Sequence, residues 1–297
     1  MKGMTVRGSA GESARHWDVT LPLPERPGAG GGPGAGGLRS AGPGARPGTQ
    51  RRKGRGRSLV RATAALVLTV ILLCVLAFGG LLLVTPSVGN ARALVAAQNR
   101  AHHAAYPGPR VPARFAAALE ATEDHRFNSE PGFDPIAVGR VFVGWLSGKG
   151  DQGGATLYQQ LAKVLYTHGN STPRDEAKQV ALAVKLNFSY SKPEILRMYA
   201  SVVYFGHGFY GMAAASCGYF GRSPHRLSWP QAALLAGLVQ GPSADDPLKF
   251  PRQARGREEH VIGRLVATGA LTQAQASAAL AVPLSSLVAN AGHGCGA

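Results

Sequence analysis

The chain is poor in acidic residues. Its 297 residues include 16 Asp and Glu against 32 Lys and Arg, which gives a formal net charge of +16. Such an excess can bind nucleic acid, but much of it lies in residues 1–58, beside an apolar segment, where basic residues act as a topology signal. We therefore expect no nucleic-acid partner. The remaining positive charge suits a surface of anionic lipid or a pyrophosphate ligand.

Cysteine is also scarce, and the nine histidines show no zinc-ligand spacing, so we expect no zinc site. Three cysteines cannot build the disulfide framework of a small secreted domain. Cys74 lies in the apolar segment, which leaves two alternatives for the others. Cys217 and Cys295 form one extracellular disulfide, or Cys217 is a buried thiol and Cys295 a free one.

Large apolar side chains are few in residues 1–58, which are rich in Gly, Pro, Ala and Arg. This composition cannot offset the entropy cost of ordering and predicts a disordered tail. Residues 59–86, in contrast, are rich in large apolar side chains. The run from Ala62 to Val84 carries no charge, and it is longer than the roughly 20 residues that a helix needs to cross a bilayer. We predict one transmembrane helix there. A cleaved signal peptide is the alternative, but its apolar region is usually about 7–15 residues long.

A basic block, Arg51–Arg57, directly precedes this apolar segment. Basic residues beside a membrane span stay in the cytoplasm. The tail is therefore predicted to be cytoplasmic, and the residues after the span to lie outside a cell membrane that the chain crosses once. Residues 87–109 are expected to form a juxtamembrane connector.

The residues that follow show little of the alternating pattern of strands, and helix-start signals recur. A Ser or Thr followed three residues later by Glu or Gln is the capping-box pattern. It predicts a mainly α fold, with a helical domain over residues 110–283 and a tail over residues 284–297. The four patterns are Thr156 with Gln159, Ser191 with Glu194, Ser228 with Gln231, and Thr272 with Gln275.

Two carboxylates end one of the predicted helices. Glu123 and Asp124 stand beside an apolar wall that includes Phe115, Leu119 and Phe127. Desolvation there would raise the pKa of a carboxyl group and suit it to act as a general base near neutral pH. The alternative is a solvated end of a helix.

A second candidate region begins with Gly153 and Gly154 and continues into a helix that carries Gln159, Gln160 and Lys163. The N-terminus of such a helix presents free amides and the positive end of the helix dipole, which favour an anion. The alternative is an ordinary capped helix with a surface lysine.

Together these motifs resemble peptidoglycan glycosyltransferase family 51, the transglycosylase domain of class A penicillin-binding proteins and of monofunctional transglycosylases. The first family motif is matched by Glu123, Asp124, Phe127, Gly132 and Asp134. The second is matched by Gly153, Gly154, Thr156, Gln159, Gln160, Leu161 and Lys163. Later matches, in order, are Ser191, Lys192, Ile195, Leu196, Tyr199, Tyr204–Gly208, Tyr210 and Gly211.

The resemblance implies a lysozyme-like helical fold and the polymerisation of membrane-held lipid II into a growing glycan strand. It implies that Glu123 is the general base and that Lys163 contacts the pyrophosphate of the donor. The other residues that it implies for substrate binding are Asp124, Phe127, Thr156, Gln159 and Gln160.

The sequence departs from the family pattern at polar positions. Glu130, Ala155 and Val164 replace a histidine, a serine and an asparagine, and Gln179 aligns with the second functional carboxylate of the family. If the alignment shifts by one helical turn, Glu176 supplies that acid instead. The family's acidic motifs can hold a divalent metal ion, and a glutamine at position 179 makes such an ion less expected.

Two other functions remain open. A catalytically degenerate relative would bind lipid II or glycan, or would scaffold cell-wall synthesis proteins. A lysozyme-like hydrolase would use a similar glutamate to cut glycan, but the second motif has no evident purpose in hydrolysis.

Overall fold

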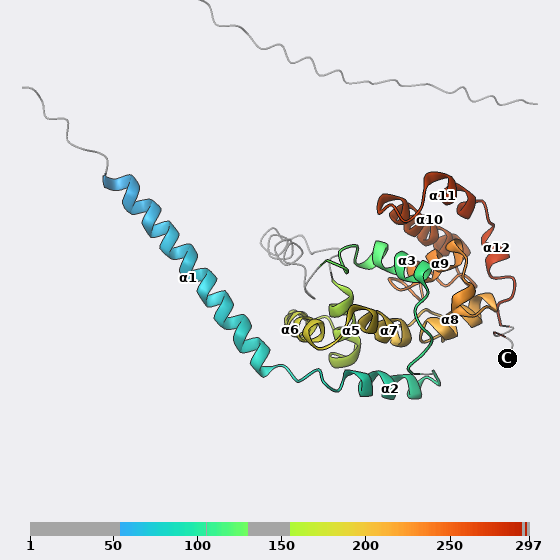
Figure 1. The fold of residues 1–297 in the computed structure, drawn as a ribbon, viewed down its shortest axis with the longest axis horizontal. Coiled ribbons are helices and arrows are strands. Elements are labelled where there is room, and N and C mark those ends of the chain that lie inside the picture. The colour runs from blue at the N-terminus through green and yellow to red at the C-terminus, as the bar shows by residue number, and fades with distance from the viewer. Residues whose placement is uncertain (1–53, 105, 130–154, 293–294, 296–297) are drawn as a thin grey trace, which may run out of the picture. The chain divides into compact units, whose positions relative to one another are not determined.

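The structure is a computed structural model that describes residues 54–104, 106–129, 155–292 and 295. Within these ranges every regular element is a helix, apart from an isolated bridge between Tyr204 and Tyr210. The predicted mainly α fold is therefore confirmed (Figure 1). In chain order the elements are α1 (Gly54–Val84), α2 (Ala91–Ala101), α3 (Ala113–Glu123), α5 (Leu157–Tyr166), α6 (Pro173–Ser189), α7 (Lys192–Val202), α8 (Met212–Phe220), η1 (Pro224–Arg226), α9 (Trp229–Leu238), α10 (Pro251–Ala267), α11 (Gln273–Leu280) and α12 (Leu284–Leu287).

The first helix, α1, contains the apolar segment. Its 26 residues Leu59–Val84 contain an 18-residue window with a mean hydropathy of 3.0, and they are exposed or only partly buried. By length and composition this helix can cross a membrane. The predicted disordered tail, residues 1–58, lies almost wholly outside the described residues.

All four predicted capping patterns stand at helix starts. The residues that precede α5, α7, α9 and α11 are Thr156, Ser191, Ser228 and Thr272. The capping box forms at three of them and satisfies amides that the first helical turn leaves unpaired. The exception is Ser191, where Glu194 pairs instead with Arg92 of α2 at 2.5 Å.

The core is built around α9, whose residues Pro230–Leu238 are all buried. It packs against α3 and α10, while α5 packs against α6 and α7. The C-terminal end of α3 meets the start of α5, where Asp124 accepts a hydrogen bond from the amide of Leu157. The first of these helices packs with α9 and α10, and the second packs with α6 and α7. The described residues of both candidate motifs lie in this region or beside it.

The segment after α1 is held against the helical domain. Lys185 of α6 donates hydrogen bonds to the carbonyl oxygens of Thr85 at 2.7 Å and Pro86 at 3.1 Å. The hydroxyl of Tyr190 donates to the carbonyl oxygen of Val88 at 2.8 Å. The predicted connector thus includes a docked segment followed by α2, which packs on α7.

The two cysteines outside α1 are joined. Cys217 of α8 and Cys295 form a disulfide with a Cα–Cα distance of 4.8 Å. Of the two alternatives for these cysteines, the structure shows the paired one. The C-terminal segment is thereby attached to α8.

A carboxylate is buried on α10. Glu258 is fully buried, its Oε2 accepts from Arg255 at 3.0 Å, and its Oε1 has no hydrogen-bond partner among the described residues. The same Arg255 also donates to the carbonyl oxygens of Leu280 and Val282, which ties α10 to the end of α11. Burial raises the pKa of Glu258 from its ordinary 4.5 to about 7, although the charge of Arg255 opposes the shift.

We predict that this group makes stability depend on pH. Because the pKa of Glu258 is higher in the folded chain, stability should fall as the pH rises from about 4.5 to about 7, by on the order of 3 kcal/mol. Glu258→Gln should remove most of this loss, as measured by thermal unfolding of the detergent-solubilised chain across that range. An exposed glutamate of α6 supplies the control, Glu176→Gln, which should keep the wild-type pH dependence because Glu176 is not among the charges that shift the pKa of Glu258. An unchanged profile in Glu258→Gln would contradict the assignment.

Candidate active site

Glu123 is the last residue of α3 and is half-buried. Burial raises the pKa of its carboxyl group, a hydrogen bond from Gln160 and the positive charge of Arg257 oppose the rise, and the charge of Asp124 adds to it. The net shift is upward, toward the range in which a carboxylate works as a general base near neutral pH. The desolvation that the sequence pattern suggested is present, whereas the catalytic role stays a prediction.

Side chains from two other helices hold this carboxylate through a chain of two hydrogen bonds. Gln160 Nε2 of α5 donates to Glu123 Oε2 at 2.9 Å, and the hydroxyl of Tyr199 of α7 donates to Gln160 Oε1. Tyr199 is only 2% exposed, and burial raises the pKa of its hydroxyl well above the usual value, so it stays a neutral donor. Because the hydroxyl occupies the amide oxygen, the amide nitrogen faces Glu123 and stabilises its ionised form.

Asp124 joins the end of α3 to the start of α5. Its side chain is buried, and Oδ2 accepts a hydrogen bond from the backbone amide of Leu157 at 2.9 Å. This bond connects residues 33 positions apart and places Gln160 beside Glu123. The geometry gives Asp124 a positioning role, and the predicted contact with substrate is untested.

Four amides at the start of α5 are already satisfied. Thr156 Oγ1 accepts from the amide of Gln159 at 3.2 Å, and Gln159 Oε1 accepts from the amide of Thr156 at 2.9 Å. Leu157 donates to Asp124, and Gln160 to the carbonyl oxygen of Thr156. These amides are therefore not free for an anion, and Thr156 and Gln159 form the helix cap. At these positions the structure favours the alternative of an ordinary capped helix.

Lys163 follows Gln160 by three residues, so the two side chains are neighbours on one face of α5. The Lys163 side chain is partly exposed and makes no hydrogen bond or ion pair with the residues that the structure describes. It is placed one helical turn from the partner of Glu123. An anion bound on this face would meet a full positive charge there.

Phe127 is buried and packs on Tyr158 with the ring centroids 5.3 Å apart. Lys192 donates to the carbonyl oxygen of Phe127, and its Nζ lies 5.5 Å from the centroid of the Phe127 ring. These contacts anchor the turn after Asp124 to the start of α7. They support a packing role, and a contact of Phe127 with substrate remains a prediction.

Gln179, aligned with the second family carboxylate, is buried on α6 and engaged elsewhere. Its Nε2 donates to Thr167 Oγ1 and to the carbonyl oxygen of Asn170, both at 2.8 Å. It therefore fixes the loop between α5 and α6. Glu176, the alternative acid, is exposed in the first turn of α6, and it is not among the charges that shift the pKa of Glu123.

The described residues do not fit a divalent metal ion. No group of three or more His, Cys, Asp or Glu side chains in the described ranges could hold one. At the position of the family's second acid, Gln179 directs amide hydrogens at its neighbours, and an amide NH₂ offers no lone pair to a cation.

Two residues of this region were missed as site residues by sequence reasoning. Tyr199 was noted only as a motif match, and its motif position was the signal that could have identified it. Arg257 of α10 gave no signal, because only the fold brings it near the acid. Its Nε donates to the carbonyl oxygen of Gly237 at 3.2 Å, and its Nη2 is buried without a partner in the described part of the chain.

Some motif positions cannot be placed. Glu130, Gly132 and Asp134 of the first motif lie outside the described residues, as do Gly153 and Gly154 of the second. The site as described therefore consists of the end of α3, the first turns of α5, and the contacts from α7 and α10.

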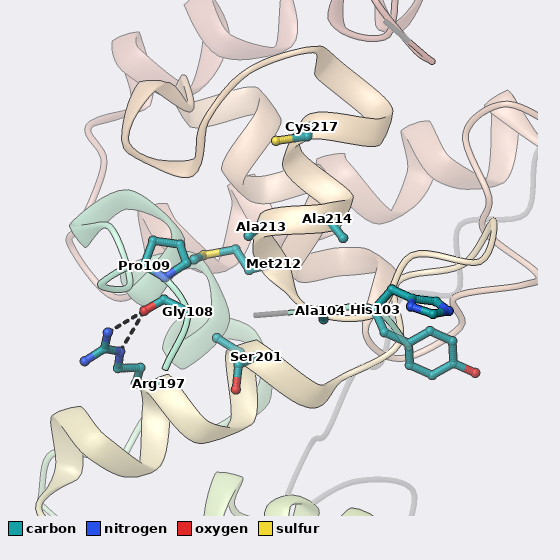
Figure 2. Close-up of a pocket in the computed structure, with 13 residues that line it drawn as sticks. His103, Ala104, Gly108, Pro109, Arg197, Ser201, Met212, Ala213, Ala214 and Cys217 are labelled. Atoms are coloured by element: carbon teal, nitrogen blue, oxygen red, sulfur yellow. Dashed lines mark hydrogen bonds between the residues drawn. The ribbon is translucent and has the colours of Figure 1, made fainter. Parts of the chain in front are cut away.

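None of the predicted site residues lines either of two cavities in the described ranges. Figure 2 shows one of these, a pocket of ≈ 260 Å³ in which Arg197 donates to the carbonyl oxygen of Gly108. The other, of ≈ 750 Å³, adjoins Arg92 and Arg110. We place the candidate site by the chemistry around Glu123 and not by these hollows.

Comparison with known proteins gives the family. The transglycosylase family model matches residues 90–266. A Cupriavidus necator protein described as a transglycosylase is 34% identical over 178 residues, which cover 60% of this chain and 77% of the relative. Penicillin-binding protein 1A of Aquifex aeolicus is 36% identical over 176 residues, covering 59% of this chain and 24% of the relative. Penicillin-binding protein 2a of Streptococcus pneumoniae is 38% identical over 169 residues, covering 57% and 23%.

The family model covers more than half of the chain, which therefore belongs to the transglycosylase family. The resemblance to peptidoglycan glycosyltransferase family 51 is confirmed at this level. The chain spans most of the Cupriavidus necator relative but only about a quarter of the penicillin-binding proteins that it matches.

We predict that Tyr199→Phe raises the pKa of Glu123. Without the hydroxyl, the Gln160 amide can turn, and Glu123 loses a hydrogen-bond donor that lowers its pKa. Carbon-13 titration of the labelled carboxyl group in the detergent-solubilised chain measures the shift directly. The control is Tyr219→Phe, which removes a hydroxyl that donates to the carbonyl oxygen of Phe205. Equal titration curves for Tyr199→Phe and wild type would contradict this chain of hydrogen bonds.

We predict that Gln179→Glu destabilises the chain, although it restores the usual family residue. A carboxylate cannot donate to Thr167 and Asn170, and an unsatisfied buried pair of this kind costs about 1–3 kcal/mol. The loss of thermal stability should be smaller near pH 4, where a protonated glutamate can donate. Gln275→Glu is the matched control, because Gln275 uses an oxygen as an acceptor in its capping box. A Gln179→Glu chain as stable as wild type at neutral pH would refute this reading of Gln179.

Proposed function

We propose that the chain is a membrane-anchored peptidoglycan glycosyltransferase that polymerises lipid II into glycan strands, with Glu123 as the general base. The main observation in support of the proposal is the environment of the Glu123 carboxyl group. Burial raises the pKa of its carboxyl group, while Gln160 donates to the same carboxylate at 2.9 Å. Membership of the transglycosylase family supplies the class of reaction.

In the proposed step, the Glu123 carboxylate takes the proton of the 4-hydroxyl group of the acceptor sugar. The freed oxygen attacks C1 of the growing glycan strand. The bond from C1 to the polyprenyl pyrophosphate breaks, and the pyrophosphate leaves with the electron pair. Glu123 ends the step protonated, which its raised pKa favours.

The leaving pyrophosphate gains negative charge and needs positive charge nearby. In this proposal Lys163 provides it, from the same face of α5 as Gln160. The amides of Thr156, Leu157 and Gln159 are engaged by the capping box and by Asp124, so in this proposal recognition relies mainly on side chains. Thr156 and Gln159 then act by fixing the helix that presents Gln160 and Lys163.

The proposed location follows from α1. Its residues Leu59–Val84 would cross the membrane, with the basic tail in the cytoplasm and the helical domain outside. That side of the membrane is where lipid II is presented for polymerisation.

A second candidate function is favoured by one observation. The family's second carboxylate is replaced by Gln179, whose side chain donates to the α5–α6 loop. A chain without that acid could bind lipid II or glycan, or scaffold cell-wall synthesis proteins, without catalysing transfer.

We expect Glu123→Gln to abolish formation of glycan polymer, because an amide cannot accept the proton of the acceptor hydroxyl. The assay is incubation of the purified full-length chain with fluorescent lipid II, followed by separation of polymer from monomer. Glu120→Gln is the control. Glu120 lies on the same helix and pairs with Asn128, so this variant should keep activity.

The same assay separates the two functions. Polymer formation by wild type that is lost in Glu123→Gln, with helical content unchanged by circular dichroism, supports the transferase. Binding of lipid II by wild type without any polymer would instead establish the non-catalytic function. Persistent polymerisation by Glu123→Gln would show that another residue is the base.

A further inference from the structure

A cavity of ≈ 750 Å³ lies outside the candidate active site, and its volume falls within the range of about 300–1,000 Å³ that is typical of small-molecule sites. Its walls are the start of α2, the connector at residues 106–111 and the first turns of α7. On α7, Arg197 lines the cavity, whereas Tyr199 donates to Gln160 beside Glu123. Residues two positions apart do not share a face of a helix, so the cavity and the Glu123 site lie on different sides of α7.

Positive charge dominates the walls of this cavity. Among the described residues that line it, three arginines stand against one glutamate, which leaves a net charge of +2. The four residues are Arg92, Arg110, Arg197 and Glu194, and we call the space between them the arginine cavity. A cleft lined mainly by charges of one sign focuses the electrostatic field and concentrates ions of the opposite sign. The arginine cavity is therefore suited to an anion.

Several hydrogen-bond donors of the cavity are uncommitted in the described part of the chain. Arg110 is exposed and makes no hydrogen bond or ion pair with the described residues. Arg92 donates from Nε to Glu194 at 2.5 Å, and its two terminal nitrogens make no described hydrogen bond. The hydroxyl groups of Tyr106 and Ser191 also have no described partner. An oxyanion could receive bonds from these groups without displacing an internal contact.

The cavity is already assembled by contacts between its walls. Arg197 Nε donates to the carbonyl oxygen of Gly108 at 3.0 Å, which holds the connector against α7. Burial raises the pKa of the Tyr106 hydroxyl, and the charge of Glu194 adds to the rise. The charges of Arg92 and Arg197 oppose it. Charged groups of α2 and α7 therefore converge on one tyrosine, which stays a neutral hydrogen-bond donor.

We propose that the arginine cavity binds a phosphorylated sugar, with the phosphate monoester held by Arg92 and Arg110. Such a phosphate carries about −1.5 to −2 charges at pH 7 and matches the net charge of the cavity, whereas a carboxylate would neutralise only half of it. Guanidinium groups bind phosphate oxygens through paired hydrogen bonds.

The rest of the cavity fits the sugar. A phosphate alone would leave most of the ≈ 750 Å³ empty. The hydroxyl groups of Tyr106 and Ser191 both donate and accept, as bonding to sugar hydroxyls requires. The apolar side chains of Val111, Pro193 and Leu196 line the same space and would lie against the carbon face of the ring.

The test is isothermal titration calorimetry of the detergent-solubilised full chain, with glucose 6-phosphate as the probe at neutral pH. A salt concentration of about 0.15 M screens exposed charges that lie more than about 8 Å from the ligand. Residues 1–58 carry many basic side chains and are present in every variant, so any phosphate that they bind contributes equally to each titration. Glucose, inorganic phosphate and glucuronate are titrated for comparison.

Three variants isolate the cavity. Arg110→Gln removes a guanidinium group that makes no described contact, so the fold should be unchanged. Glu194→Gln removes the negative charge and keeps an oxygen that can accept from Arg92. The matched control is Arg252→Gln, because Arg252 is exposed in the first turn of α10 and does not line the cavity.

Arg110→Gln should bind glucose 6-phosphate at least about tenfold more weakly than wild type, since it loses hydrogen bonds between charged groups. Glu194→Gln should bind it more tightly, which a purely structural role of this residue would not produce. Arg252→Gln should match wild type, and glucose should not bind.

Absence of binding to wild type, or equal affinities of wild type and Arg110→Gln, would overturn the site. Inorganic phosphate bound as tightly as glucose 6-phosphate would overturn the choice of a sugar. Glucuronate bound as tightly would overturn the choice of a phosphate. None of these outcomes depends on Glu123 or on transferase activity.

Discussion

A single buried hydrogen bond, from the amide of Leu157 to Asp124, sets the geometry of the candidate site. It satisfies an amide at the start of α5 that has no hydrogen-bond partner within the helix, and it holds the end of α3 in place at the same time. With these helix ends joined, Gln160 comes within 2.9 Å of Glu123. Loss of such a buried partner typically costs about 1–3 kcal/mol, so the bond matters for the fold as well as for the acid.

The electrostatic balance at Glu123 is achieved by neutral groups more than by charge pairs. Burial against the apolar core raises the pKa of the carboxyl group, and the amide of Gln160 opposes that rise without adding a charge. The buried hydroxyl of Tyr199 fixes which way this amide points. A second carboxylate nearby would raise the pKa of Glu123 further, whereas Gln179 stabilises a loop instead.

The helices and the position of the acid could be predicted from local sequence, because capping patterns and apolar runs act over a few residues. Thr156 and Thr272 show this, since their side chains cap α5 and α11 as expected. Ser191 shows the limit, because Glu194 of the same pattern pairs with Arg92, 102 residues earlier. Tertiary contact, not local spacing, decided the partner.

Contacts between distant parts of the sequence also explain why sequence patterns did not identify every residue of the candidate site. Arg257 influences Glu123 from a helix 134 positions later in the numbering, and no spacing rule connects them. The glutamine at position 179 could be recognised as a departure from the family. Its hydrogen bonds to Thr167 and Asn170 became visible only once the α5–α6 loop was in place.

The bond between Cys217 and Cys295 closes a loop over a sequence separation of 78 residues. In the chain-entropy account, a closure of that length removes enough freedom from the unfolded chain to stabilise the fold by roughly 4.5 kcal/mol. Such a bond lasts only where glutathione and thioredoxin do not reduce it. A reducing compartment would remove this stabilisation and the covalent link, and the C-terminal segment would then be held to α8 by contacts such as the hydrogen bond from the amide of Gly292 to the carbonyl oxygen of Gly218, at 2.9 Å.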